Sequence, residues 1–371
     1  MGNMENWYTP SAEWIAQQAN APEWWKGDVA DVEEVVKTVR RGHVRLGCQS
    51  PGGRNVYVVE YGEPNDQHRT ATYSSALGAR DIKYYSDKTD PNYRPCIFFI
   101  GCVHGGEFEG TVAILNLIQL LETGKDFAGN ENPDLVALAE QCHLILIPCV
   151  NPDGRSHFPF KSALGMDYNP FRYYDQGMWL DGTMCDWPQV KRIHPIKDHV
   201  QYLGGYFNDD GVNLMHDNFF NPLSKEVRLM LDIAYENAPD FIINFHGACG
   251  CNPSFCDGSS MYTTLREEIE ELEFRIHDLC AAEGIPFTAK HKDFTNLRTT
   301  KPAFVNLSWA LHHVCGGISL AHESQQGVIN NPASNGCNEW GPDYWHIYRE
   351  HMICMAETIR FTAKRLEAQK G

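Results

Sequence analysis

The chain has 371 residues, of which 43% are hydrophobic and 12% aromatic, so it is long enough to build one or two domains with a large core. Its formal net charge is −17, which excludes nucleic acid and anionic membranes as favoured partners because both would repel the protein. No stretch approaches the roughly 18 uninterrupted apolar residues of a membrane-spanning helix, and the start of the chain has no signal-peptide pattern.

The 13 cysteines are an odd number scattered along the chain. This usage indicates reduced thiols and a cytoplasmic location. The close group Cys249, Cys251 and Cys256 also leaves open a thiolate metal site or a redox site, although no second paired cysteine motif accompanies it.

Short apolar strands alternate with helices along the chain. Residues 1–45 are expected to form a polar, helical extension, with one helix over Asp31–Arg41 that is ended by Gly42. The predicted strands cover Val44–Leu46, Asn55–Tyr61, Cys96–Val103, Leu144–Val150, Phe241–Phe245 and Gly317–Ala321. Helices are predicted after Glu107, over Lys225–Asn237 and from Pro342 to Ala368. This alternation indicates an α/β fold with a mixed, mostly parallel central sheet and helices on both faces.

An imidazole and a carboxylate lie at one strand-to-helix corner of this pattern. The apolar run Cys96–Val103 ends at His104, two glycines follow, and Glu107 precedes a helical pattern. The motif His-x-x-Glu also occurs by chance in a chain of this length. Its position at a strand-to-helix corner is therefore the evidence for a metal site. Zn²⁺ binds His nitrogen and carboxylate oxygen, and a hydrolytic zinc site has three protein ligands and one open position.

Two further candidate residues follow later strands. His246 comes after Phe241–Phe245, and Glu323 comes after Gly317–Ala321. In open α/β sheets, ligands bind outside the carboxyl ends of the strands. We therefore expect His104, Glu107 and His246 to hold one zinc ion. Glu323 is then the general base and acid.

His322 competes with Glu323 for that role because the two residues are adjacent in the sequence. Neighbours on a strand point to opposite faces of the sheet, so only one of them can face the metal. A carboxylate suits proton transfer from water to a departing amine, and this favours Glu323.

Together these features resemble the zinc carboxypeptidases of the M14 family over roughly residues 50–365. In that family a two-ligand motif follows a central strand, and an Asn-Pro-Asp-Gly turn comes next, as at Asn151–Gly154 here. A later His is the third ligand, and a Glu on a late strand is the base that activates water. The resemblance implies that residues 46–371 form a zinc carboxypeptidase-like catalytic domain that hydrolyses an amide bond of a peptide.

The first departure from the family concerns recognition of the substrate carboxylate. Many members carry Asp-Leu-Asn-Arg-Asn-Phe after the turn, and its Asn-Arg pair binds the terminal carboxylate of the substrate. Here Met215 and His216 occupy those two places, and no Arg lies between Gly211 and Arg228. A protonated His216 would still bind a carboxylate, in a pH-dependent way.

The second departure is a missing tyrosine, because no Tyr occurs between Tyr262 and Tyr344 in the region where the family has a phenol that closes over the substrate. The third is an aromatic-rich insertion over residues 155–210, which we expect to form a rim over the site. The cation that stabilises the oxyanion is expected from this insertion, with Arg192 preferred, then Arg172, and with Arg155 as a further substrate contact.

Two other functions stay open. The missing Asn-Arg pair is compatible with a zinc-dependent deacylase or amidohydrolase that acts on N-acyl amino acids or modified peptides. A non-catalytic metal-binding protein on the same fold is the second alternative, although all three ligands and the base are present. Two His and a carboxylate also suit Fe(II), so the metal itself is a separate question.

Overall fold

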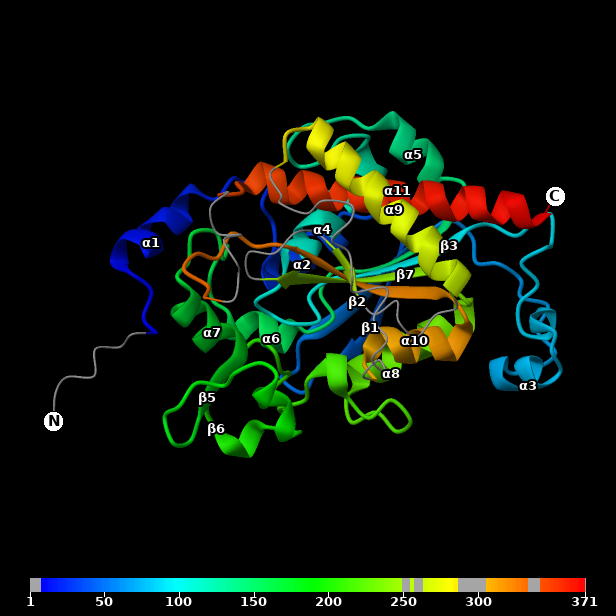
Figure 1. Ribbon diagram of the computed structural model, residues 1–371. Helices are drawn as coiled ribbons and strands as arrows, with labels where there is room; N and C mark the ends of the chain where they lie inside the picture. Colours follow the sequence, from blue (N-terminus) through cyan, green and yellow to red (C-terminus); the bar gives the residue numbers. More distant parts are fainter. Residues whose placement is uncertain (1–7, 249–253, 257–262, 286–304, 333–340, 371) are drawn as a thin grey trace, which may run out of the picture.

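A seven-stranded sheet forms the centre of the computed structural model, with helices on both faces (Figure 1). The structure describes residues 8–248, 254–256, 263–285, 305–332 and 341–370. The strand order is β1-β2-β4-β3-β7-β9-β8, and β5 and β6 form a separate two-stranded sheet. The strands are β1 (His43–Gln49), β2 (Asn55–Tyr61), β3 (Cys96–Ile100), β4 (His143–Ile147), β5 (Gly177–Trp179), β6 (Val200–Leu203), β7 (Phe241–Ala248), β8 (Ser254–Cys256) and β9 (Ile318–Gln325).

The four central strands β4, β3, β7 and β9 are parallel, and β1, β2 and β8 add antiparallel pairs at the two edges. The predicted α/β class with a mixed, mostly parallel sheet is therefore confirmed. Parallel strands end at the same edge of the sheet, so the carboxyl ends of β3, β4, β7 and β9 lie together there. None of the helices in the described part of the chain is long and apolar enough to cross a membrane.

The helices divide into two layers, one on each face of the sheet (Figure 1). One layer contains α2, α4, α5, α9 and α11, and the other contains α8 and α10. The helices are α1 (Ala12–Gln17), α2 (Val29–Val36), α3 (Tyr73–Gly78), α4 (Glu109–Thr123), α5 (Pro133–Ala139), α6 (Pro152–His157), α7 (Tyr168–Gln176), α8 (Lys225–Asn237), α9 (Thr263–Ala282), α10 (Leu307–Cys315) and α11 (Tyr344–Lys370).

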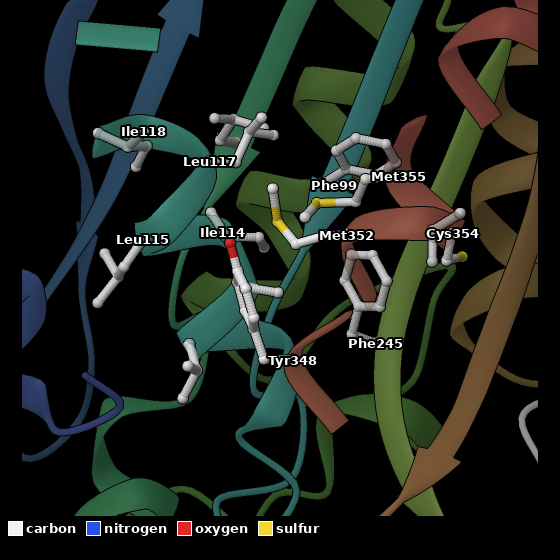
Figure 2. Packing of buried hydrophobic residues seen from close by; sticks show 14 of the residues in the cluster. Phe99, Ile114, Leu115, Leu117, Ile118, Phe245, Tyr348, Met352, Cys354 and Met355 are labelled. Carbon is white, nitrogen blue, oxygen red and sulfur yellow. The ribbon is translucent and has the colours of Figure 1, made fainter. Parts of the chain in front are cut away.

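The apolar strands supply both cores because successive side chains point to opposite faces. Phe99 packs into the core beneath α4 and α11, whereas Phe98 packs into the core beneath α8 and α10. Figure 2 shows the first of these cores, in which side chains of α4 and α11 close over Phe99 and Phe245. This two-sided burial explains why the strands are almost continuously apolar.

Most predicted elements are present, and the differences are mainly at their ends. The helix predicted over Lys225–Asn237 and the strand predicted over Asn55–Tyr61 have the predicted bounds. The helix predicted over Asp31–Arg41 begins earlier, at Val29, because Asp28 and Asp31 form a capping box at its start. The sequence did not predict the strands β5, β6 and β8 or the helices α3, α5, α6, α7, α9 and α10.

The amino-terminal residues pack onto the main core. Trp14 and Trp25 are buried, and their indole nitrogens donate to the carbonyls of Leu164 and Lys161 at 2.9 and 2.8 Å. The segment before β1 is therefore tied to the start of the insertion.

The cysteines whose side chains are described are free thiols, most of them buried. Cys249, Cys251 and the side chain of Cys256 lie outside the described part of the chain. The thiolate site at this group therefore stays a prediction.

Glu226 in the first turn of α8 is fully buried, and burial raises its pKa to about 7. A carboxyl whose pKa is higher in the folded chain than in the unfolded one lowers stability as pH rises between the two values. We expect Glu226→Gln, which retains an oxygen to accept from Asn208, to stabilise the protein by about 2 kcal/mol at pH 8 and by less than about 1 kcal/mol at pH 5. Thermal unfolding at the two pH values measures this difference.

Glu236, an exposed residue of the same helix, provides the matched control. Glu236→Gln is expected to have the same small effect at both pH values. If Glu226→Gln raises the free energy of unfolding equally at both pH values, the buried charge of Glu226 is not the cause of the effect.

Candidate metal centre

The three predicted ligands meet at the carboxyl ends of two parallel strands. His104 and Glu107 lie in the loop between β3 and α4, and His246 lies on β7, the direct neighbour of β3. One ligand atom from each residue lies within 4.8 Å of the others, and all three side chains are buried. In the described part of the chain this is the one group of this kind.

Two glycines allow the loop after β3 to approach the backbone of Gly154 and the side chain of Asp175. A Cβ on Gly105 would lie 1.9 Å from the carbonyl carbon of Gly154, so no larger residue fits there. A Cβ on Gly106 would lie 2.3 Å from Oδ1 of Asp175, which accepts from the Gly106 amide at 3.2 Å. His104 and Glu107 are thus held close to the Asn-Pro-Asp-Gly turn and to α7.

The predicted turn Asn151–Gly154 forms the first turn of α6, with Asn151 as its N-cap, and it supports the loop directly. The Asn151 amide nitrogen donates to the Val103 carbonyl at 3.1 Å, and Asn151 Oδ1 accepts from the Gly154 amide at 2.9 Å. Asp153 accepts from Ser50 Oγ at 2.6 Å and from Arg54 at 2.8 Å. These contacts show that the turn shapes and anchors the site.

Asn213 sets the tautomer of His104. Its Oδ1 accepts the backbone N–H of Met215 at 3.0 Å, which identifies that atom as the acceptor, and it lies 3.2 Å from His104 Nε2. When Nδ1 binds a metal, His104 carries its proton on Nε2 and donates it to Asn213 Oδ1. Its Nδ1, 3.0 Å from Glu107 Oε2, then presents a lone pair.

Asn244, two residues before His246 on β7, orients the imidazole of His246 in the same way. The Asn244 amide nitrogen donates to Ser308 Oγ and to the Leu320 carbonyl, each at 2.9 Å, so its Oδ1 faces His246 Nε2 at 2.8 Å. Nδ1 of His246, 2.7 Å from Glu107 Oε2, is left as an acceptor. An orienting partner behind each histidine is typical of protein metal sites.

The electrostatics of the three side chains fit a cation. Burial alone would raise the pKa of Glu107, but the imidazoles, His104 foremost, hold it well below its usual value, so the carboxylate is charged. Burial lowers the pKa of His104, so its imidazole stays neutral. Two lone pairs and one carboxylate thus face a common point, and ligands about 2 Å from one zinc ion lie roughly 3.3 Å apart at the tetrahedral angle. The donor set is suited to zinc.

Glu323 lies beside His246 in the sheet. The register of the parallel pair β7–β9 sets these two residues opposite each other, so both side chains lie on the same face. His322 points to the other face, where its Nε2 lies 2.5 Å from Oε1 of Glu350 on α11. Only Glu323 of this adjacent pair is directed to the side that bears His246.

The two residues in the place of the family's Asn-Arg pair have different surroundings. Met215 is buried and packs into the core beneath α8 and α10, and its contact with a substrate stays a prediction. His216 is half-buried, and burial, with further contributions from Lys191 and His104, lowers its pKa to about 3. The expected protonated His216 is therefore corrected to a neutral imidazole near pH 7.

Arg155 has a structural role in place of the expected substrate contact. Its side chain is buried, and all three guanidinium nitrogens donate within the fold, to Asp28 and to the carbonyls of Gly27, Phe158 and Phe160. The guanidinium also stacks over the ring of Phe108 at 3.8 Å. The local sequence did not indicate this burial, because it is the distant amino-terminal segment that folds over Arg155.

The other two arginines of the insertion differ in exposure. Arg172 on α7 pairs with Asp186 at 2.7 Å. Arg192, at the end of a 3-10 helix over Gln189–Arg192, is exposed, and no hydrogen bond or ion pair engages it among the described residues. Among the described residues, no contact places either arginine at the three predicted ligands.

Sequence reasoning missed the two asparagines that orient the histidines. Asn244 carried a usable signal, because it lies two residues before His246 on a strand and so shares its face. Asn213 carried no local signal, since it is 109 residues from His104 in the chain.

The chain was compared with protein families and with solved structures, and both comparisons found zinc carboxypeptidases. The zinc carboxypeptidase family model of peptidase M14 matches residues 38–165. Among curated protein sequences, none matches this chain. The fold is shared with the metallo-carboxypeptidase from Burkholderia cenocepacia, at 14% identity and a TM-score of 0.54 over 91% of this chain and 69% of that one. It is also shared with the carboxypeptidase A from Helicoverpa armigera, at 13% identity and a TM-score of 0.53 over 96% of this chain and 79% of that one.

Thrombin activatable fibrinolysis inhibitor also shares the fold, at 11% identity and a TM-score of 0.56 over 94% of this chain and 77% of that one. This chain shares the fold of these metallocarboxypeptidases, and it has a three-residue group that could hold a metal ion. The similarity to the zinc carboxypeptidase family thus consists of the family-model match over residues 38–165 and the shared fold.

Proposed function

We propose that this protein is a zinc-dependent hydrolase that cleaves an amide bond of a peptide, in the manner of a carboxypeptidase. The observation that carries the proposal is the convergence of His104, Glu107 and His246 at one strand edge, with Glu323 on the adjacent strand beside His246. A metal-holding protein without catalysis would need only the three ligands.

His104 Nδ1, Glu107 and His246 Nδ1 are the groups that would hold the metal. A bound zinc ion supplies Lewis acidity, which polarises a carbonyl and makes water a better nucleophile at neutral pH. Glu323 accepts a proton from the attacking water at a carboxylate oxygen and then donates it to the departing amine nitrogen. A cationic side chain of the insertion, Arg192 or Arg172, would neutralise the developing oxyanion.

A second candidate is a deacylase that acts on N-acyl amino acids or modified peptides. The neutral state of His216 favours it, because a neutral imidazole binds a substrate carboxylate less strongly than an arginine fork does. The two functions share the metal and the base and differ in the group that flanks the scissile amide.

Matched substrates test the proposal on the full chain loaded with one equivalent of zinc. A peptide with a free carboxyl terminus, the same peptide with a carboxyl-terminal amide, and an N-acetyl amino acid are compared. A carboxypeptidase is expected to release the last residue only from the free peptide, because loss of the carboxylate leaves its recognition site unpaired. Chelation is expected to remove the activity, and zinc is expected to restore it.

Cleavage of the N-acetyl amino acid without cleavage of the free peptide would select the deacylase. If the protein binds one equivalent of zinc and still leaves a broad panel of peptides and N-acyl amino acids intact, the hydrolase is refuted in favour of a non-catalytic metal-binding protein.

A further inference from the structure

A tyrosine ring covers one face of the His104 imidazole. The ring of Tyr206 lies parallel to it, with 3.8 Å between the ring centroids and an interplanar angle of 7°, and the tyrosine is 8% exposed. His246 meets the same imidazole nearly edge-on, at 4.8 Å and 71°. Hydrogen bonding at the ring nitrogens sets the tautomer of His104, whereas a parallel ring in contact restricts the tilt of its plane.

Backbone hydrogen bonds tie the segment of Tyr206 to α7 and to the loop that carries His104. The Tyr206 amide donates to the carbonyl of Asp175 on α7 at 2.7 Å, and the carbonyl of Gly205 accepts from the amide of Gly105 in the His104 loop at 2.6 Å. The tyrosine and the histidine are therefore held in one register by neighbouring residues of each. A shift of one segment against the other would break these bonds and separate the rings.

Tyr206 also belongs to a small core that is distinct from the two cores of the sheet. This satellite core is built from the aromatic-rich insertion, and its buried members are Cys185, Val190, Ile196, Tyr206 and Phe207. Tyr206 is the member that also contacts a predicted metal ligand. The insertion thus reaches the site through a ring that is anchored in its own core.

We propose that Tyr206 is a positioning residue for the metal site, through which the insertion holds the imidazole of His104 in the orientation that binds zinc. The inference rests on the proposed metal site, and it gives the insertion a role besides forming a rim. Tyr206 acts through His104 and makes no contact with substrate in this role.

Zinc affinity, measured by competition with a chromophoric chelator, tests the proposal on the full chain. Tyr206→Leu removes the stacked ring and is expected to weaken zinc binding about tenfold, whereas Tyr206→Phe keeps the ring and is expected to stay within roughly twofold of the wild type. Phe207→Leu is the matched control, because Phe207 lies in the same satellite core. It is expected to lower the melting temperature and leave the zinc affinity unchanged.

Two results would count against this role. Wild-type zinc affinity in Tyr206→Leu would overturn it, as would equal weakening in Phe207→Leu, which would show that the satellite core acts only through general stability. If Tyr206→Leu does not fold, Tyr206→Met provides the same comparison. Failure of the wild type itself to bind zinc would refute the metal site, and that outcome is separate from a change confined to the Tyr206 variants.

Discussion

Glu323→Gln is expected to reduce amide hydrolysis by roughly 10²- to 10⁴-fold, because a side chain that transfers the proton in both steps is lost. The substitution keeps the size and the hydrogen-bonding oxygen of the side chain but removes its basic carboxylate. The position beside His246 on the same face of the sheet is the reason to expect this effect. The turnover number and the zinc content of the purified variant are measured together.

Zinc content is expected to stay at the wild-type level, since the three ligands are unchanged. Glu283→Gln is a suitable control, because Glu283 is an exposed residue at the end of α9 that pairs with Arg349 at 2.6 Å. It is expected to leave turnover unchanged. Turnover of Glu323→Gln within tenfold of the wild type would rule out Glu323 as the base.

Glu107→Gln is expected to weaken zinc binding by at least roughly a hundredfold, more than the loss of an orienting partner costs at such a site. Glu107 Oε2 lies 3.0 and 2.7 Å from Nδ1 of His104 and His246, so it is the side chain shared by both imidazoles. A neutral amide supplies no charge to the metal and places a donor among the ligands. Zinc affinity is measured by chelator competition, and hydrolysis is expected to fall with zinc occupancy.

Glu109→Gln is the matched control because Glu109 is only two residues away and equally buried. Its carboxyl accepts from Gln326 at 3.4 Å, and burial raises its pKa to about 7. This variant is expected to bind zinc as the wild type does. Equal loss of zinc in both variants would indicate a general disturbance of the start of α4 and would remove the support for Glu107 as a ligand.

The fold could be predicted in large part from local patterns. The strands β3, β4 and β7 are short apolar runs, and α8 begins at Ser224, whose side chain accepts from the Val227 amide. α10 escaped prediction although it has similar signals, an Asn306 cap and Gly316 at its end with a φ of 80°. Its sequence is short and rich in histidine, so its apolar period is weak.

The three candidate ligands and Glu323 could be read from the sequence because each follows an apolar strand. In a parallel sheet such positions share one edge, so local order along the chain indicates proximity in space. Side chains alternate between the two faces of the sheet along β9, so local order also indicated that His322 and Glu323 point to opposite faces.

The surroundings of these residues were decided by tertiary structure alone. Asn213 and Tyr206 reach His104 from more than a hundred residues away, and their contacts depend on how the insertion packs. Arg155 carries a charge that suggests substrate binding, but the amino-terminal segment buries it and takes up its donors.

The sequence by itself thus determined the class of fold and the residues that can bind a metal, because strand periodicity and strand ends are local properties. Only the tertiary structure decided which partners orient the two histidines, that His216 is neutral, and that Met215 is part of the core. Tautomers, pKa values and burial depend on the groups that distant segments bring into contact, and sequence order does not specify those contacts.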